Sequence, residues 1–388
     1  QVTGLSDGGF VVTWVFSDGD GYDIFGQRYD SSGVAAGEEF QTTHIGTSSS
    51  GHPSVASLID GGFVVTWEAY DQDGYSNIFG QRYDSTGVAA GDAFQINTYT
   101  TDDQEQPSVS SLNDGGFVVT WYSDGQDGSE NGIFGQRYDS SGVATGDEVQ
   151  INTYTTGDQE QPSVSSLSNG GFVVTWYSDG QDGSENGIFG QRYDSSGFAT
   201  GAEFQINTFT TGDQKQPAVS SLSDGGFVVT WMSDGQDGSE NGIFGQRYDS
   251  SGVAAGNEFQ VNTYTNSGQH LPSVTSLGDG GFVVTWVSGD NAPEAGGIYG
   301  QRFDAEGNKI AVHQPDTIPP TVSIAMSDEA LKVGDTSTVT FTFSEEPTGF
   351  TAEDVTVANG ALSDFTVTSD AKVYTATYTP TADVEDTT

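Results

Sequence analysis

The chain has 388 residues, with 10 Lys plus Arg against 55 Asp plus Glu and a formal net charge of −45. This charge excludes nucleic acid as a partner, because phosphate binding needs clustered Lys and Arg. No apolar run approaches the roughly 18 residues of a membrane span. The chain has 23 Phe, 16 Tyr and 6 Trp, enough for a large core, and no cysteine. Most of the chain is therefore expected to be folded. The lack of cysteine excludes disulfides and thiolate metal sites.

Internal repetition dominates the sequence. The segment GGFVVTW occurs six times, at intervals of 53 to 55 residues, and contains every tryptophan: Trp14, Trp67, Trp121, Trp176, Trp231 and Trp286. A second motif, I-[FY]-G-Q-R-[FY]-D, follows each copy and contains every arginine: Arg28, Arg82, Arg137, Arg192, Arg247 and Arg302. We interpret the arginines as structural, bonding carboxylates or carbonyls between repeats, and the tryptophans as core.

Each repeat predicts four β-strands and no helix. In the third copy the strands are expected at 107–112, 116–123, 132–139 and 148–154, each bounded by Gly, Asp, Asn or Ser. The N-D-G between the first two strands predicts a tight hairpin, because these residues tolerate positive φ.

Six such units predict an all-β fold, a six-bladed β-propeller of four-stranded blades built from repeats of about 54 residues over residues 1–314. An open solenoid and a string of separate domains are the alternatives, and units this short disfavour the string. The chain begins in mid-motif and is interpreted as part of a longer chain or filament, which leaves open a seventh blade upstream of Gln1.

The repeats end at a Pro-rich linker, residues 315–320. Residues 321–388 then alternate Thr with Val and predict an incomplete immunoglobulin-like β-sandwich. Its strands are expected at 321–326, 337–343, 354–357, 365–368 and 373–378.

The repeat unit D-G-G-F-V-V-T-W, followed by G-I-F-G-Q-R-Y-D-S-S-G and Q-P-S-V, resembles repeats of large bacterial exported proteins. These are RTX-type adhesins and cadherin-like calcium-binding surface proteins. The segment 339–365 resembles a bacterial immunoglobulin-like domain of the same proteins. The resemblance implies a secreted or cell-surface location and calcium-stiffened stalks, although the G-G-x-G-x-D calcium motif of RTX tails is missing here.

The loops between the second and third strands, named here the acidic loops, are the candidate Ca²⁺ sites. Calcium takes six to eight oxygens from carboxylates, amides and carbonyls on turn-forming loops, which D-x-x-D-x-x-E with interleaved Gly, Gln and Asn can supply. Ordinary solvated turns are the alternative. The candidate metal ligands are Asp18, Asp20, Asp23, Asp71, Asp73, Asp124, Asp127, Glu130, Asp179, Asp182, Glu185, Asp234, Asp237 and Glu240.

In up-and-down sheets, the connections between repeats emerge on the same face as the acidic loops. These connections contain T-x-x-D-Q-x-Q-P, with Asp103, Asp158 and Asp213, so one face is expected to be ringed by carboxylates and amides. Such a face could bind cations or polyhydroxylated ligands, and a solvated loop face is the alternative.

No catalytic constellation stands out. The four histidines, His44, His52, His270 and His313, lack metal-ligand spacing, and no nucleophile motif is present. The leading hypothesis is therefore a non-enzymatic structural or adhesive module of an extracellular bacterial surface protein, stabilised by Ca²⁺, with glycans or other surface proteins as partners. The alternative is a glycan-binding propeller lectin or a polysaccharide-degrading enzyme with the propeller as scaffold.

Overall fold

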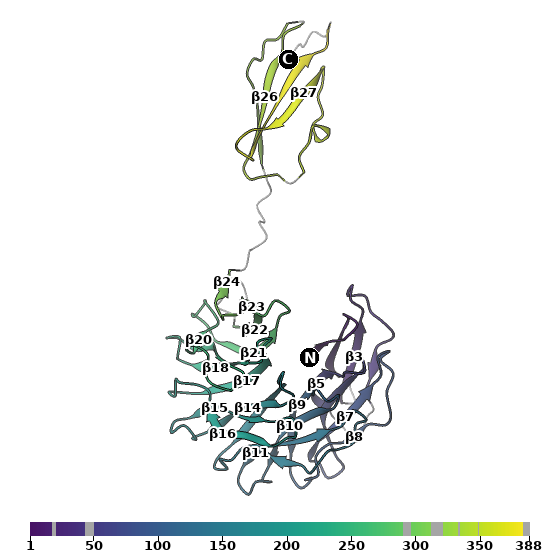
Figure 1. Cartoon of the computed structure of the whole chain (residues 1–388), viewed down its shortest axis with the longest axis vertical. Helices are drawn as coiled ribbons and strands as arrows, with labels where there is room; N and C mark the ends of the chain where they lie inside the picture. The colour runs from purple at the N-terminus through teal and green to yellow at the C-terminus, as the bar shows by residue number, and fades with distance from the viewer. Residues whose placement is uncertain are drawn as a thin grey trace. The chain divides into compact units, whose positions relative to one another are not determined.

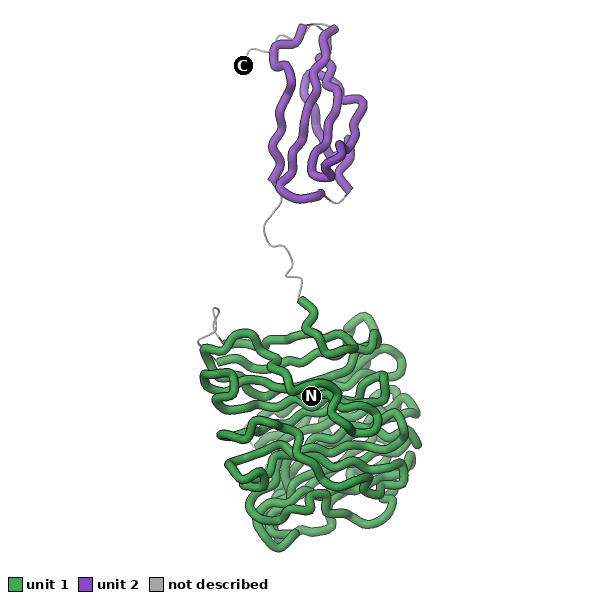
Figure 2. Tube along the Cα trace, turned by 60° about the vertical axis from the view of Figure 1, so that its left-hand side comes forward, with its two compact units in different colours: residues 1–312 green, residues 313–388 purple. Residues whose placement is uncertain are grey.

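The computed structural model describes residues 1–17, 21–42, 50–289, 296–311, 321–332, 334–347 and 349–382. Contacts divide the chain into two compact units, Gln1–Val312 and His313–Thr388 (Figure 2). Unit 1 contains six four-stranded antiparallel sheets and unit 2 contains one. In these ranges, no helix is long and apolar enough to cross a membrane. The expected linker, residues 315–320, lies outside the described residues.

Each sheet of unit 1 pairs its four strands in chain order. Sheet 1 contains β1 (Val2–Gly4), β2 (Phe10–Ser17), β3 (Tyr22–Tyr29) and β4 (Phe40–Gln41). Sheet 2 contains β5 (Ser50–Ser57), β6 (Phe63–Tyr70), β7 (Ser76–Tyr83) and β8 (Phe94–Gln95). Sheet 3 contains β9 (Gln104–Ser111), β10 (Phe117–Asp124), β11 (Asn131–Tyr138) and β12 (Val149–Gln150). Sheet 4 contains β13 (Gln159–Ser166), β14 (Phe172–Asp179), β15 (Asn186–Tyr193) and β16 (Ala199–Gln205). Sheet 5 contains β17 (Gln214–Ser221), β18 (Phe227–Asp234), β19 (Asn241–Tyr248) and β20 (Phe259–Gln260). Sheet 6 contains β21 (Gln269–Ser276), β22 (Phe282–Ser288), β23 (Gly297–Phe303) and β24 (Lys309–Ile310).

The strand predictions for the third repeat are confirmed for the second and third strands, to within one residue. The fourth strand, β12, is shorter than expected. The strand β12 ends early because of the side chain of Asn152. The Asn152 Oδ1 atom accepts a hydrogen bond from the Ile133 backbone N–H at 2.8 Å, in place of a backbone carbonyl of a longer β12. The first strand, β9, begins earlier than expected and contains an irregularity at Gln106 and Pro107, where the register with β10 shifts.

The core of unit 1 lies between the sheets. Alternate residues of the second strand point to opposite sides, so each sheet has a Trp face (Phe117, Val119 and Trp121 in sheet 3) and an Ile face (Val118 with Ile133). The Ile face of each sheet packs on the Trp face of the next in five successive clusters. The expected place of the tryptophans in the core is confirmed, since those of sheets 2 to 5 are 0% exposed.

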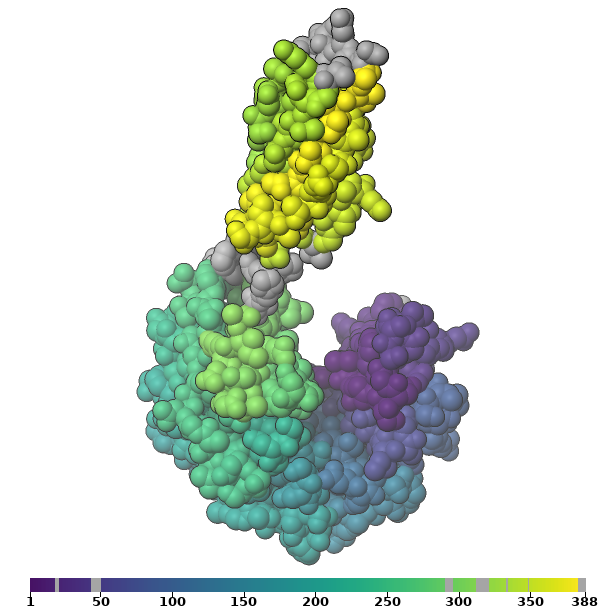
Figure 3. Space-filling model, turned by 45° about the horizontal axis from the view of Figure 1, so that its top comes forward, coloured from purple at the N-terminus to yellow at the C-terminus, as the bar shows by residue number. Residues whose placement is uncertain are grey.

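The closed ring predicted from the repeats is wrong. Figures 1 and 3 show unit 1 as an open arc, with a gap between the N-terminal and C-terminal sheets. Ile298, on the Ile face of sheet 6, is 81% exposed, whereas Ile133 and Ile243 at the same position are 0% exposed. The rotation between neighbouring sheets is set by their packing, and six sheets at this rotation do not complete a turn.

Unit 2 is one sheet in the order β25 (Val322–Met326), β26 (Ser337–Phe343), β28 (Val373–Pro380) and β27 (Gly360–Val367). Its core centres on Val339, Phe341 and Ala376. The predicted strand at 354–357 is wrong. A single 3₁₀ turn, Ala352–Asp354, precedes it, and residues 355–357 pair with no strand in the described part of unit 2.

Candidate functional site

The first strands β5, β9, β17 and β21 lie toward the inside of the arc (Figure 1), and the first strand β13 contacts β9 and β17. The repeats are nearly identical in sequence, but the residue type changes from repeat to repeat at one position of the first strand. The residue opposite it on the second strand of the same sheet also changes. We name these residues the inner strip. The pairs are Gly51 with Glu68, Glu105 with Tyr122, Glu160 with Tyr177, Lys215 with Met232, and His270 with Val287.

Glu68 is the most buried carboxylate of the inner strip. It is 8% exposed, and its Oε1 atom lies 2.7 Å from His52 Nδ1. Its Oε2 atom accepts a hydrogen bond at 2.9 Å from the backbone N–H of Gln106, in the next sheet. A Cβ on Gly51 would lie 2.9 Å from Glu68 Oε1, so glycine at that position gives the carboxylate its space. The hydrogen bond to Glu68 raises the pKa of the exposed His52 imidazole.

Glu105 lies in the neighbouring sheet, within electrostatic range of Glu68. The hydroxyl of Tyr122 donates a hydrogen bond to its carboxylate. Burial raises the pKa of Glu105, and the negative charges of Glu68 and Asp103 raise it further, against the opposing effect of the Tyr122 hydrogen bond. The two carboxylates therefore have different environments: hydrogen-bond donors hold Glu68, whereas burial and neighbouring charges raise the pKa of Glu105.

Sheets 4 and 5 extend the strip with other side chains. Glu160 accepts hydrogen bonds from the Tyr177 hydroxyl and, at 2.8 Å, from Asn131 Nδ2. Lys215 Nζ lies 5.7 Å from the centre of the Tyr177 ring and 3.2 Å from Asp213 Oδ2. The strip thus presents carboxylates, phenols, an imidazole and one ammonium group.

The backbone beside the strip adopts a left-handed conformation that non-glycine residues rarely take. It occurs at the residue before the proline of each first strand: His52, Gln106, Gln161, Gln216 and Leu271, with φ from 44° to 58°. Gln161 Oε1 accepts a hydrogen bond from the Gln216 N–H at 3.0 Å, and Gln216 Oε1 one from the Leu271 N–H at 2.7 Å. Hydrogen bonds between neighbouring sheets therefore stabilise the strained backbone at these positions. Strained backbone of this kind is often found at functional sites.

The predicted metal ligands of the acidic loops are only partly brought together. Asp124 lies beside the connections between repeats, as expected: its N–H donates to the Asp103 carbonyl at 2.9 Å. Burial raises the pKa of Asp124, and the charges of Asp102, Asp103 and Asp158 raise it further. Asp127 instead accepts the Ser129 N–H at 3.0 Å within its own turn.

The other copies repeat this arrangement. Asp179 and Asp234 lie at the position of Asp124, and their N–H groups donate to Asp158 and Asp213. Asp182 and Asp237 accept from Ser184 and Ser239 within their turns, and Gly180 and Gly235 donate to the backbone carbonyls of Glu185 and Glu240.

The loops of sheets 1 and 2 differ from these. Asp71 Oδ1 accepts three backbone N–H groups of its own turn, from Asp73, Gly74 and Tyr75. Asp23 is half-buried in β3, and Asp18 and Asp20 lie outside the described residues. Among the residues that the structure describes, no three His, Asp or Glu side chains are grouped to hold a metal ion. Calcium binding by these loops stays a prediction.

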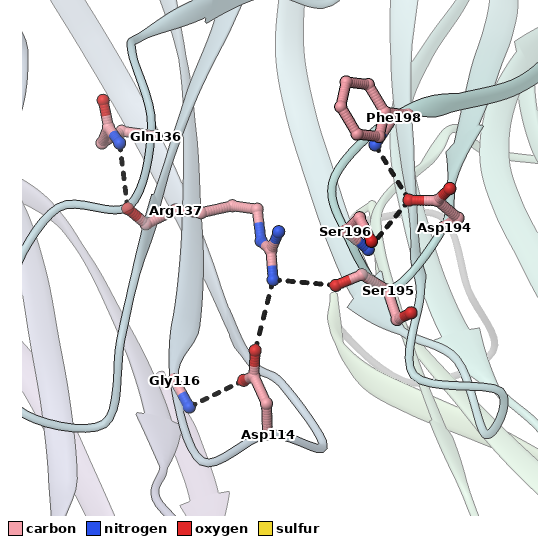
Figure 4. A network of polar contacts seen from close by, with 8 residues as sticks. All are labelled: Asp114, Gly116, Gln136, Arg137, Asp194, Ser195, Ser196 and Phe198. Atoms are coloured by element: carbon pink, nitrogen blue, oxygen red, sulfur yellow. Dashed lines mark hydrogen bonds and ion pairs between the residues drawn. The ribbon is translucent and has the colours of Figure 1, made fainter.

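The structural role predicted for arginine is confirmed. Figure 4 shows Arg137, whose side chain is 16% exposed, donating to Asp114 Oδ2 at 3.2 Å and to the Ser195 carbonyl of the next sheet at 3.0 Å. Arg192 likewise donates to the Ser250 carbonyl of sheet 5 at 2.9 Å. Arg302, in the last sheet, is the exception and is 49% exposed.

The inner strip was not predicted from the sequence, because the shared motifs directed attention to loops and arginines. The signal was present in the short segments before each conserved P-[SA]-V: S-G-H, Q-E-Q, Q-E-Q, Q-K-Q and Q-H-L. Variation in such segments, within repeats that are otherwise nearly identical, marks the positions that the fold does not fix.

Residues 316–388 match the family model described as a bacterial Ig-like domain. No curated protein matches the sequence significantly. Among solved structures, a protein of unknown function from Dyadobacter fermentans is similar, with TM-score 0.57 and 11% identity over 78% of this chain and 93% of that chain. An α-L-arabinofuranosidase from Lactobacillus brevis has TM-score 0.39 and 13% identity over 66% of this chain and 92% of that chain.

An endo-arabinase from Bacteroides thetaiotaomicron has TM-score 0.38 and 14% identity over 61% of this chain and 88% of that chain. The Dyadobacter likeness shows the fold alone, and the two glycan-active enzymes are too distant to bear on function. The chain thus carries a C-terminal bacterial Ig-like domain, at residues 316–388, after an all-β array of four-stranded sheets.

Proposed function

We propose that unit 1 is a glycan-binding module and that the inner strip is its ligand site. One observation supports this proposal above the others: the repeats differ from each other along the strip, where Glu68, Glu105 and Tyr122 form a partly buried cluster of hydrogen-bonding groups. Sugar hydroxyls need both donors and acceptors at fixed positions, and paired carboxylates and phenols supply both. The function follows from this site and not from the fold, which supports many functions.

The charge of the chain restricts the ligand. A net charge of −45 repels anionic polysaccharides over distances well beyond contact, so the expected ligand is a neutral or amine-bearing glycan. A neutral glycan gains nothing from the negative field, and its binding is expected to depend little on salt.

The bacterial Ig-like domain supports an extracellular or cell-surface location. In that setting, glycan binding by unit 1 is one form of the adhesive role expected from the sequence. Binding of another surface protein remains the alternative partner, and bracing of the acidic loops by Ca²⁺ is a separate proposal.

Glycan cleavage is a second candidate, favoured by the unequal environments of Glu68 and Glu105. Glycoside hydrolysis uses a protonated carboxyl as general acid beside an ionised carboxylate, and the raised pKa of Glu105 is of this kind. The second carboxylate would be Glu68, held by His52 and the Gln106 N–H.

The test is a glycan array probed with the whole chain, with and without Ca²⁺, followed by titration calorimetry of the best neutral ligand. Tyr122→Phe removes one donor and Glu105→Gln removes one charge, and each is expected to weaken binding at least about tenfold, which is about 1.4 kcal/mol. Glu38→Gln, at an exposed carboxylate away from the strip, is the matched control. Binding that both strip variants retain in full would refute the site. Release of reducing ends that Glu105→Gln abolishes would establish the second candidate.

A further inference from the structure

The two ends of the unit 1 array expose complementary halves of one interface. On sheet 6 the Ile face is uncovered, with Val287 37% exposed and Ile298 81% exposed. On sheet 1 the Trp face is uncovered, so Phe10, Val12 and Trp14 are half-buried. Their equivalents in sheet 2, among them Trp67, are 0% exposed.

The polar contact that joins neighbouring sheets, between an arginine and a turn of the following sheet, is also missing at sheet 6. Arg82, Arg137 and Arg247 are 13% to 16% exposed and lie against turn glycines of the following sheet. Arg302 occupies the same place in sheet 6, is 49% exposed, and contacts the Asp279 carboxylate of its own sheet. Apolar and polar contacts thus stop together at this end, as they do where a partner surface is missing.

We propose that one further four-stranded sheet of the same repeat, located N-terminal to β1 in the same polypeptide, fills the gap and closes the array. This proposal follows from the packing within unit 1, where the Ile face of each sheet covers the Trp face of the next. In a closed array, the sheet that covers the Trp face of sheet 1 either precedes sheet 1 or follows sheet 6 in the chain. The chain leads from sheet 6 to the Ig-like domain, so a following repeat cannot serve.

The same sheet would complete both ends. Its Ile face would cover Trp14, and its Trp face would cover Ile298 and give Arg302 a neighbouring turn. Closure removes the exposed end faces of the array, which open repeat arrays otherwise need polar caps to protect.

The test compares the six-sheet chain with a seven-sheet chain in which a copy of residues 104–162 is joined to Gln1. This copy keeps the repeat phase, because Ser163 corresponds to Gln1 relative to the tryptophan of each repeat. Ile298→Glu is introduced in both chains. In the six-sheet chain it should change Tm by less than about 1 °C, because Ile298 is exposed. In the seven-sheet chain it should lower Tm by more than about 3 °C, because it places a charge in an apolar interface.

A second readout is binding of a hydrophobic dye, which should be lower for the seven-sheet chain. Equal effects of Ile298→Glu in the two chains, or a seven-sheet chain that fails to fold, would overturn the proposal. A dimer of the six-sheet chain that Ile298→Glu dissociates would also overturn it, because a second copy would then cover the end faces.

Discussion

Arg137 of sheet 3 contacts Gly197 of the neighbouring sheet 4. The turn residue Gly197 has a φ of 85°, and a Cβ at this position would lie 2.9 Å from both Cδ and Nη1 of Arg137. The same contact recurs between Arg82 and Gly142 and between Arg247 and Gly307. The arginine of one repeat and the turn glycine of the next therefore form one unit of the interface.

Gly197→Ala should destabilise unit 1 more than the same change at Gly87. Both glycines have positive φ, so alanine costs about 1–2 kcal/mol at either position. Only Gly197 also faces an arginine, since a Cβ on Gly87 would meet nothing within 4 Å. Urea denaturation measures the difference, and equal losses of stability would show that the Arg137 contact is dispensable.

Arg137→Lys should lower the free energy of unfolding by about 1–2 kcal/mol, because lysine cannot keep both the Asp114 and the Ser195 bonds in the same planar geometry. Arg302→Lys is the matched control. Its side chain is half-exposed and has no following sheet, so its effect should stay within about 0.5 kcal/mol. A similar small effect at Arg137 would contradict the structural role.

Stability should fall as the pH rises from 4.5 to 8. The raised pKa of Glu105 means that the folded state binds its proton more tightly than the unfolded chain. This stabilisation is complete below 4.5, the ordinary pKa of Glu, and is lost as the pH rises through the folded pKa. His52, with its raised pKa, gives a further loss above 6.5.

Glu105→Gln should therefore raise Tm at pH 8 and reduce the slope of Tm against pH. His52→Asn should reduce the slope only above pH 6.5. Thermal melts at several pH values provide the measurement, with Glu38→Gln as control. A Glu105→Gln chain that is less stable than the parent at pH 8 would contradict the desolvation of Glu105.

Calcium at millimolar concentration should raise Tm beyond the effect of sodium chloride at equal ionic strength. An ion that binds only the folded chain stabilises it by about 2.7 kcal/mol at a hundredfold excess over Kd. Asp124→Asn with Asp127→Asn should reduce the number of ions bound without unfolding unit 1. Equal effects of the two salts would leave the acidic loops as solvated turns.

Local signals predicted most of the strands, because the N-D-G hairpin and the alternation of Phe117 to Trp121 act within a few residues. They also predicted the structural role of the arginines, with Arg302 of the last sheet as the exception. The opening of the array was not predictable, because it depends on the rotation between packed sheets, which no short motif encodes. Glu68 was missed for a different reason. Its partner His52 is brought to it by the pairing of β5 with β6, and its partner Gln106 by the stacking of sheets 2 and 3, and neither contact is local in the sequence.

Hydrogen–deuterium exchange with the best neutral glycan from the array tests the proposed site most directly. Binding at the inner strip should protect residues 104–111 and 117–124, the strands that contain Glu105 and Tyr122. Residues 125–130, in the acidic loop of the same sheet, should exchange at an unchanged rate. Protection confined to the acidic loops, or no protection in unit 1, would contradict glycan binding at the inner strip.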